Sequence, residues 1–454
     1  MQAKLFYETQ SDRAIPLYLI SQGQWEEQSC KLTSAERNCF ALYQFKGNIG
    51  DSCTMFNADG LIEKVYIGCG EDNQAQAMAN AALVLPPNTY KVQGFCSQEA
   101  LMNWALAQYC FEAYKKNENK PRILVINSDE VNDLLNLVQA QFLVRDLINK
   151  PTSDLGPKEM AEVVEQLANT HNAQFKQWVG DELLTDNFPA IHAVGRASKS
   201  APRLLSLTWG DESHPRVTLV GKGVCFDSGG LDIKSAYGMR LMKKDMGGAA
   251  HVIGLAQWVM TRNLPVRLHL LIPAVENSIG PDAFRPGDVL TMRNGLTVEI
   301  HNTDAEGRLI LADALVKACE EQPDLLIDFA TLTGAARVSV GSEIAAFFTN
   351  NNKLAAEVSD VSMKALDPVW RLPLFDAYEE ILRSNVANLS NASDHPYAGA
   401  IVAGLFLQRF VSKTIPWIHL DIMAWNLSSK PGKPEGGEAM GFRSIAAYLL
   451  QTYG

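Results

Sequence analysis

The sequence has no apolar run long enough to cross a membrane. The longest runs, such as residues 398–407, fall well short of the roughly 20 residues that a membrane helix needs. The beginning of the chain carries charged side chains and lacks a long apolar core, so no secretory signal is expected. We therefore expect a cytoplasmic protein with no membrane partner.

The chain also has fewer basic than acidic residues. Lys and Arg number 40 against 51 Asp and Glu, which gives a formal net charge of -11. A broad surface for nucleic acid needs many cations to neutralise phosphates. This balance therefore argues against a nucleic-acid partner, although a DNA-binding scaffold is kept as a non-enzymatic alternative.

The usual cysteine and histidine patterns of metal sites are missing. None of the eight cysteines belongs to a C-x-x-C pair, and the eight histidines form no H-E-x-x-H. Zinc sites of those common kinds are therefore not expected. Without a secretory signal, the cysteines are expected to be thiols in a reducing compartment.

Nucleotide-binding patterns fail as well. Gly221-Lys222-Gly223 suggests a phosphate loop, but Arg216 stands where the first glycine of that loop belongs and Gly223 replaces its Ser or Thr. The dinucleotide pattern fails because its third glycine would fall on Phe226.

The length and the pattern of apolar residues predict an α/β protein of more than one domain. The chain has 454 residues, 47% of them hydrophobic and 20% charged, as in globular proteins. Residues 1–128 predict a small α/β domain, and residues 129–150 an amphipathic linker helix that ends before Pro151. Strands and helices alternate over residues 151–454, which predicts a mostly parallel sheet flanked by helices. Within the first domain, helices are expected over residues 74–83 and 98–114.

The stretch N-T-D-A-E-G-R-L at residues 302–309 places two acids and an arginine close together. It separates a strand-like run from a helix-like run, which is where ligands collect in α/β domains. If the segment is extended, Asp304 and Glu306 leave it on the same side. Two such carboxylates repel unless a cation lies between them or one holds a proton. The alternative is a helix start with acids that favour the helix dipole.

Two more acids stand in glycine-rich stretches. Asp227 lies in G-K-G-V-C-F-D-S-G-G-L-D-I-K at residues 221–234, and Asp245 in M-K-K-D-M-G-G-A-A at residues 242–250. Glycines let the backbone approach a ligand closely. Four converging carboxylates could all ionise beside two divalent ions, which in such sites lie roughly 3.5–4 Å apart.

These three motifs, in this order, resemble the leucine aminopeptidase (cytosol aminopeptidase) family of dinuclear metallopeptidases. The resemblance covers about residues 145–454 and includes the family's signature octapeptide without a change. It implies an aminopeptidase that removes the N-terminal residue from peptides with a free N-terminus, by means of metal-activated water. It also implies a homohexamer.

The resemblance assigns a role to each motif residue. It implies that Asp227 and Glu306 bridge two metals, that Asp304 completes one site, and that Lys222 and Asp245 complete the other. Lys222 would have to be neutral, which two adjacent dications favour; the alternative for Lys222 is a salt bridge to Asp227. Zinc or manganese is the first expectation, and cobalt or magnesium the alternative.

By the same resemblance, Lys234 stabilises the oxyanion of the tetrahedral intermediate. Bicarbonate would be the general base, and the resemblance implies that Gly307, Arg308 and Leu332 form its site. The pocket for the first side chain would be lined by Met242, Thr331 and Gly334. One departure borders this pocket: the family's H-L-D-I-A-G-T-A-W is shortened here to residues 419–425. The preferred first residue is therefore not predicted, and another dinuclear metal hydrolase, such as a phosphatase, is the enzymatic alternative.

Overall fold

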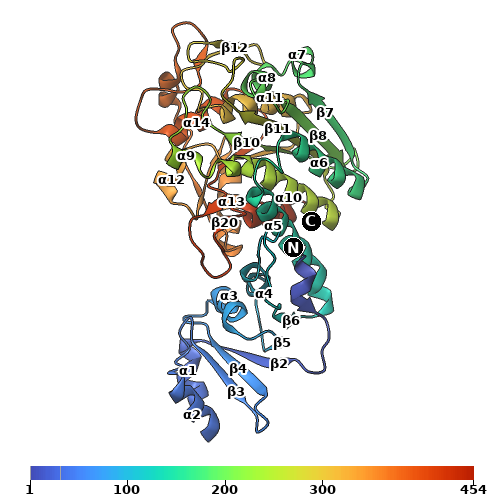
Figure 1. Ribbon diagram of the computed structural model, residues 1–454, viewed down its shortest axis with the longest axis vertical. Coiled ribbons are helices and arrows are strands. Elements are labelled where there is room, and N and C mark those ends of the chain that lie inside the picture. Colours follow the sequence, from blue (N-terminus) through green and yellow to red (C-terminus); the bar gives the residue numbers. More distant parts are fainter. Residues whose placement is uncertain (1, 31) are drawn as a thin grey trace. The chain divides into compact units, whose positions relative to one another are not determined.

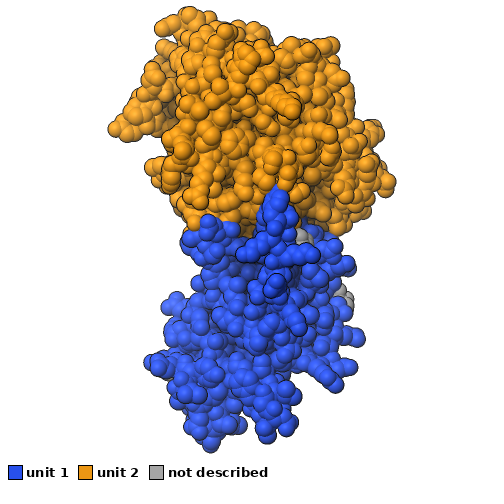
Figure 2. All heavy atoms as spheres, viewed as in Figure 1, with its two compact units in different colours: residues 1–142, 428–435 blue, residues 143–427, 436–454 orange. Residues whose placement is uncertain are grey.

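The computed structural model describes residues 2–30 and 32–454 (Figure 1). The chain divides into two compact units, which are coloured separately in Figure 2. The first unit comprises residues 1–142 and 428–435, and the second comprises residues 143–427 and 436–454. Each unit has its own hydrophobic core. No helix within the described residues is both long and apolar enough to span a bilayer.

The first unit is built on a six-stranded sheet with the order β1-β6-β5-β2-β4-β3. Neighbouring strands are parallel except for β3 and β4. The strands are β1 (Tyr7–Glu8), β2 (Ile15–Ile20), β3 (Ser52–Phe56), β4 (Ile62–Gly68), β5 (Thr89–Gln93) and β6 (Ile123–Val125). The helices are η1 (Ala3–Phe6), α1 (Gln22–Ser29), α2 (Ser34–Leu42), α3 (Gln74–Val84), α4 (Gln98–Ala107) and α5 (Ser128–Asn149), the last of which continues into the second unit.

Helix α4 is shorter than predicted. It starts where expected, with the Ser97 side chain accepting from the Ala100 N–H, but it ends at Ala107 and not at Tyr114. At this end the Gln108 side chain accepts from the Arg122 N–H and donates to the Arg122 carbonyl. These bonds fix Gln108 to the segment that enters β6, a partner that the local pattern of apolar residues does not reveal.

The second unit holds a nine-stranded sheet with the order β16-β15-β18-β14-β9-β11-β8-β7, and β10 also pairs with β11. Its central strands β18, β14, β9 and β11 are parallel, while β8, β7 and the β15–β18 pair are antiparallel. The strands are β7 (Gln174–Val179), β8 (Arg203–Trp209), β9 (Arg216–Gly221), β10 (Gly223–Asp227), β11 (Arg267–Asn277), β14 (Leu325–Ala330), β15 (Ala345–Thr349), β16 (Val369–Arg371) and β18 (Trp417–Asp421). The predicted α/β class with mostly parallel sheets is confirmed.

Two small sheets complete the strands of this unit. One joins β12 (Val289–Thr291), β13 (Thr297–Glu299) and β17 (Leu389–Ser390), and the other joins β19 (Trp425–Asn426) and β20 (Gly436–Gly437). The helices are α6 (Pro157–His171), α7 (Glu182–Thr185), α8 (Pro189–Gly195), α9 (Ala236–Met239), η2 (Met242–Met246), α10 (Gly247–Arg262), α11 (Gly307–Glu320), α12 (Gly334–Val340), α13 (Asn352–Lys364), η3 (Asp376–Leu382), α14 (Gly399–Gln408) and α15 (Phe442–Tyr453).

Helices cover both faces of the central sheet. Successive residues of a strand point to opposite faces. Val220 of β9 packs in the core that includes the apolar side chains of α11 and α14. A Cβ on the next residue, Gly221, would lie 2.7 Å from the Ala249 Cα of α10. The second unit is therefore a three-layer arrangement, with α11 on one face of the sheet and α10 on the other.

Candidate functional site

Motif residues far apart in the sequence meet at the carboxyl ends of the parallel strands. Lys222 follows β9, Asp227 ends β10, and Thr331 follows β14. Strands β9 and β10 pair with consecutive parts of β11, and the break between them falls at Lys222. Opposite this break lies Pro273, which has no N–H to donate to a strand ladder. The break releases the Lys222 side chain from the regular alternation of a strand and leaves it among the acids.

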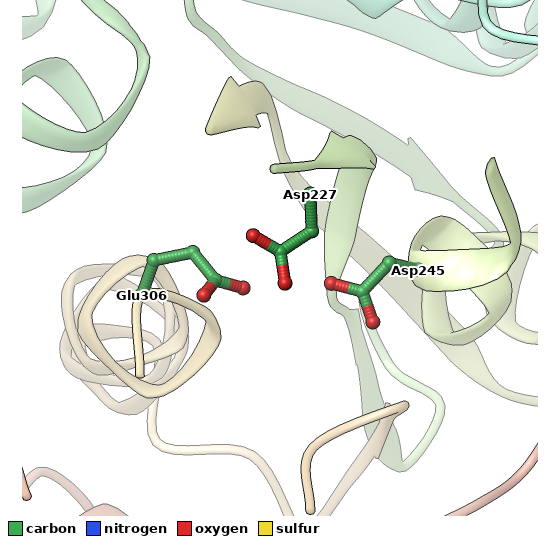
Figure 3. A group of neighbouring side chains, drawn as sticks. All are labelled: Asp227, Asp245 and Glu306. Carbon is green, nitrogen blue, oxygen red and sulfur yellow. The ribbon is translucent and has the colours of Figure 1, made fainter. Parts of the chain in front are cut away.

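Three carboxylates converge in the interior (Figure 3). One ligand oxygen from each of Asp227, Asp245 and Glu306 lies within 4.8 Å of the other two. They come from β10, from η2 and from the residue that precedes α11. All three residues are at most 3% exposed. The predicted convergence of acids is therefore present for these three residues.

Asp304 lies at the edge of this group, next to Asp227. Its segment is not extended as expected: the Asn302 side chain accepts from the Asp304 N–H at 2.7 Å and closes a turn. The Asp304 side chain is consequently 33% exposed, and its Oδ1 contacts the Lys234 ammonium group. Lys234 Nζ also lies 2.8 Å from Asp227 Oδ2, so Lys234 links Asp304 to the buried carboxylates.

Glu306 is the most weakly satisfied of the acids. Among the described residues neither of its carboxylate oxygens accepts a hydrogen bond, although Oε1 lies 3.1 Å from Lys222 Nζ. Burial, followed by the Asp227 carboxylate, raises the pKa of Glu306 to about 8. The same two causes raise the pKa of Asp304 to about 6. The cluster thus carries more negative charge than its own lysines neutralise.

Lys222 occupies the centre of the buried acids. Its Nζ lies 2.7 Å from Asp245 Oδ2 and donates to the Thr331 carbonyl at 3.0 Å. Burial disfavours its charge, yet Asp245, Glu306 and Asp227 outweigh burial and raise the pKa of Lys222. Lys222 therefore forms salt bridges, as in the alternative interpretation. Its partners, however, are Asp245 and Glu306 rather than Asp227.

Arg308 does not pair with the acids beside it in the sequence. Among the described residues it forms no ion pair; its Nη1 donates to the Asn391 carbonyl at 2.6 Å, and its Nε has no hydrogen-bond partner. Burial lowers the pKa of Arg308 to about 10, against the opposing effect of Glu306. A buried guanidinium with a donor to spare is suited to a small anion.

The turn after β14 is fixed to both the acids and the neighbouring strand. The Thr331 hydroxyl donates to Asp245 Oδ1 at 2.7 Å. The Leu332 and Thr333 N–H groups donate to Asp421 Oδ1 at 3.0 and 3.1 Å. Leu332, predicted to help to hold bicarbonate, thus has its N–H engaged by Asp421 in this structure.

The remaining predicted residues stand at the starts of three helices. Met242 begins η2 and is half-buried, whereas Gly334 begins α12 and is exposed. Gly307 begins α11, directly before Arg308. Two histidines stand near the motifs: His251 is a buried residue bonded to Gly247 and Met440, and His301 lies 3.0 Å from Glu299.

Sequence reasoning missed residues that support the site from a distance. Asn277 donates to Asp227 Oδ1 at 2.9 Å, Asn391 holds Arg308, and Asp421 holds the Thr331–Thr333 turn. Asn277 and Asp421 stand in stretches that match the family, but nothing local marks Asn391. It follows its partner by 83 residues, so only the fold brings the two together.

Residues 142–446 match the family model described as "Cytosol aminopeptidase family, catalytic domain". The chain belongs to the cytosol aminopeptidase family. It is therefore an enzyme, an aminopeptidase of a family of metallo-exopeptidases, and the resemblance inferred from the three motifs is confirmed.

Family relatives agree along nearly the whole chain. A probable cytosol aminopeptidase of Syntrophotalea carbinolica is 38% identical over 447 residues, which are 90% of each chain. The crystal structure of the cytosol aminopeptidase from Coxiella burnetii has a TM-score of 0.95 and 45% identity, and covers 99% of both chains. The bottromycin maturation enzyme BotP in complex with Mn has a TM-score of 0.87 and 32% identity, over 97% of this chain and 100% of that one.

The residues present fit the metal dependence of the family. A buried carboxylate without a hydrogen bond is costly unless it is neutralised, and Glu306 is such a group. Four carboxylates against Lys222 and Lys234 leave a formal excess of two negative charges when all are ionised (2 − 4 = −2). A divalent cation removes this excess, and oxygen donors suit such hard ions.

Proposed function

We propose that the protein hydrolyses the N-terminal residue from peptides with two divalent metal ions held by Asp227, Asp245, Asp304, Glu306 and Lys222. The single observation that carries the proposal is the buried Glu306 carboxylate, which lacks a hydrogen bond and lies within 4.8 Å of Asp227 and Asp245. When bound, such ions acidify water and polarise a carbonyl group. Zinc or manganese is proposed first, and cobalt or magnesium fit the same donors.

Lys222 has to change its charge for this role. In this structure Asp245 and Glu306 hold it as an ammonium group. A lysine can donate a lone pair only after it loses its proton, and positive charge placed among the acids lowers its pKa. Lys222 is therefore a counter-ion to these acids in this structure, and it would be a neutral donor to a bound metal.

Lys234 is proposed to stabilise the oxyanion of the tetrahedral intermediate. It lies at the open side of the cluster, since its side chain is 16% exposed while that of Lys222 is 4% exposed. Asp227 and Asp304 outweigh burial and raise the pKa of Lys234, so it stays an ammonium group. A fixed positive charge at this edge can donate to the oxygen of the scissile carbonyl as negative charge develops there.

Arg308 is proposed to hold bicarbonate together with the backbone of Gly307 and Leu332. A bicarbonate ion bound there would supply the proton-accepting group that the described side chains do not offer. Arg308 is suited to this task because Asn391 fixes one of its nitrogens and Nε is left without a partner. The Leu332 N–H, now bonded to Asp421, would have to share its donor with the anion.

The pocket for the first side chain is proposed to include Met242, Thr331 and Gly334. Thr331 touches Asp245, so the turn that carries Gly334 begins at the acids.

A homohexamer in the cytoplasm is proposed as the working form. Light scattering of the metal-loaded protein tests the assembly, and a molar mass of one chain would contradict it.

Two substrate comparisons test the proposed activity. A leucyl peptide with a free amine should be cleaved, and the same peptide with an acetylated N-terminus should not. Equal rates on the two peptides would remove the exopeptidase proposal. A metal-dependent phosphatase would instead hydrolyse an aryl phosphate and leave aminoacyl-anilides intact.

A further inference from the structure

An arginine lies one turn into the helix that begins at the proposed pocket. Arg337 belongs to α12, whose first residue is Gly334. Its side chain turns back: Nη2 would lie 3.3 Å from a Cβ atom placed on Gly334. Its Nη1 lies 3.1 Å from Met423 Sδ. The guanidinium group of Arg337 thus lies over Gly334, which is proposed to line the pocket. The two residues are three positions apart in the chain.

Contacts connect this guanidinium group to the acids. Thr331, at the start of the turn, donates to Asp245. On the other side, a Cβ on Gly247 would lie 3.0 Å from Thr331 Cγ2 and 2.5 Å from Ala424 Cβ. Ala424 follows Met423, the contact of Arg337. Arg337 therefore belongs to the same wall of packed residues as a proposed metal ligand.

Arg337 has no counter-ion in this wall. Among the described residues, no carboxylate oxygen lies within 4.0 Å of the side-chain nitrogens of Arg337, the distance that defines an ion pair. The same holds for Lys244. Lys244 is 3% exposed and precedes Asp245. Neither cation therefore has a counter-ion within ion-pair distance among the described residues.

The nearby carboxylates are already engaged. Asp245 accepts from Thr331 and pairs with Lys222, and Asp421 accepts from Leu332 and Thr333. The exposed guanidinium group of Arg337 is not paired with these acids and can therefore pair with an anion from solvent. Such an anion would have to enter from the pocket.

We propose that Arg337 selects peptides whose first residue is aspartate or glutamate. The proposal rests on the proposed function, in which Thr331 and Gly334 border the first side chain. A planar guanidinium group binds a carboxylate through two parallel hydrogen bonds. Met423, whose Sδ accepts from Arg337 Nη1, provides apolar surface beside the guanidinium group.

Aminoacyl-anilides of Glu, Asp, Leu and Lys measure this preference in the metal-loaded enzyme. We expect kcat/KM for Glu or Asp to exceed that for Leu by about tenfold or more, and Lys to be poorest. A faster reaction with Leu than with either acidic substrate would overturn the inference while leaving the aminopeptidase proposal intact. Hydrolysis of none of the four would instead contradict the proposed function.

Variants of Arg337 locate the preference. Arg337→Met should lower the Glu/Leu ratio of kcat/KM by about tenfold or more, and Arg337→Lys should keep part of it. Arg337→Glu should raise the Lys/Glu ratio. Arg383→Met is the matched control, because Arg383 is a surface residue paired with Glu380 at 3.0 Å. Its ratios should equal those of the unaltered enzyme.

Binding gives a readout that is separate from turnover. Free glutamate should inhibit Leu-anilide hydrolysis at lower concentration than free leucine, and Arg337→Met should remove this difference. An unchanged Glu/Leu ratio in Arg337→Met, with circular dichroism showing a folded protein, would assign Arg337 to the surface and overturn the inference.

Discussion

Gly307 and Lys222 lie so close together that a Cβ atom on Gly307 would be 2.6 Å from Lys222 Nζ. Helix α11 therefore starts with a residue that leaves room for a lysine from the break between β9 and β10. The same lysine is held by Asp245, Glu306 and the Thr331 carbonyl. One ammonium group thus ties together the segments that present the acids.

Gly307→Ala should displace Lys222 and weaken metal binding. An added methyl group in a packed site typically costs about 1–3 kcal/mol, and here the displaced group is a proposed ligand. We expect the variant to fold, to bind metal more weakly and to lose at least about tenfold in kcat/KM, since about 1.4 kcal/mol corresponds to tenfold. Calorimetric metal titration and anilide hydrolysis measure the two effects.

Gly23→Ala is the matched control for Gly307→Ala. A Cβ on Gly23 meets no atom within 4 Å, so this change adds a methyl group in open space. Metal affinity in Gly307→Ala as high as in Gly23→Ala would show that Lys222 can move away without consequence.

Lys234→Met should act on the transition state. The ammonium group is proposed to donate to an oxygen that becomes negative during the reaction. Loss of one such donor typically lowers kcat by about 10²–10³-fold. Steady-state kinetics should show a large fall in kcat with little change in KM. A rise in KM at constant kcat would make Lys234 a substrate-binding residue.

Arg308→Ala should slow the enzyme without releasing metal. Asn391 and the unpartnered Nε place the guanidinium for an anion rather than for the acids. General-base assistance is worth about 10²–10⁴ in rate. Removal of carbonate from the buffer should slow the unaltered enzyme, and added bicarbonate should restore it but hardly affect the variant. If carbonate removal has no effect, or if the variant's activity falls in step with its metal content, Arg308 is structural.

Acid should weaken the fold through His251. Its Nε2 accepts from the Met440 N–H at 2.8 Å and its Nδ1 lies 2.6 Å from the Gly247 carbonyl, so the ring is neutral with the proton on Nδ1. Burial lowers the pKa of His251 to about 4. A lowered pKa means that the unfolded chain binds the extra proton first. Stability contributed by neutral His251 is therefore present above pH 6.5 and lost as the pH falls towards 4.

Urea unfolding across this range tests the effect of His251. The loss of unfolding free energy between pH 6.5 and 4 should be smaller in His251→Gln than in the unaltered protein. The exposed His214 offers the control variant His214→Gln, whose pH dependence should match that of the unaltered protein. An equal pH dependence of the unfolding free energy in all three proteins would show that protonation of His251 does not destabilise the fold.

The acids of the site could be predicted because they stand in contiguous sequence motifs. Asp227, Asp245 and Glu306 each stand in a short stretch that resembles one family, and they do converge. Their burial could not be predicted from spacing. Asn302 closes a turn that leaves Asp304 partly exposed, while Glu306 at the start of α11 is buried. Residues two apart therefore took different environments.

The parts of the fold that escaped prediction depend on distant partners. Periodicity predicted the alternation of strands and helices over residues 151–454, because apolar patterns such as those of α10 and β14 are local. It missed β10, which is short and stands in a glycine-rich motif, and it extended α4 beyond Ala107. Asp421, which holds the turn after β14, follows Leu332 by 89 residues. Only the assembled sheet brings those two residues together.

Titration of the metal-free protein with manganese or zinc tests the account most directly. Metal content by mass spectrometry and hydrolysis of an aminoacyl-anilide are followed together in the unaltered protein and in Glu306→Gln. The account predicts two divalent ions per chain, activity that appears as they bind, and loss of both in Glu306→Gln. Full activity in the metal-free protein, or equal metal binding by Glu306→Gln, would contradict it.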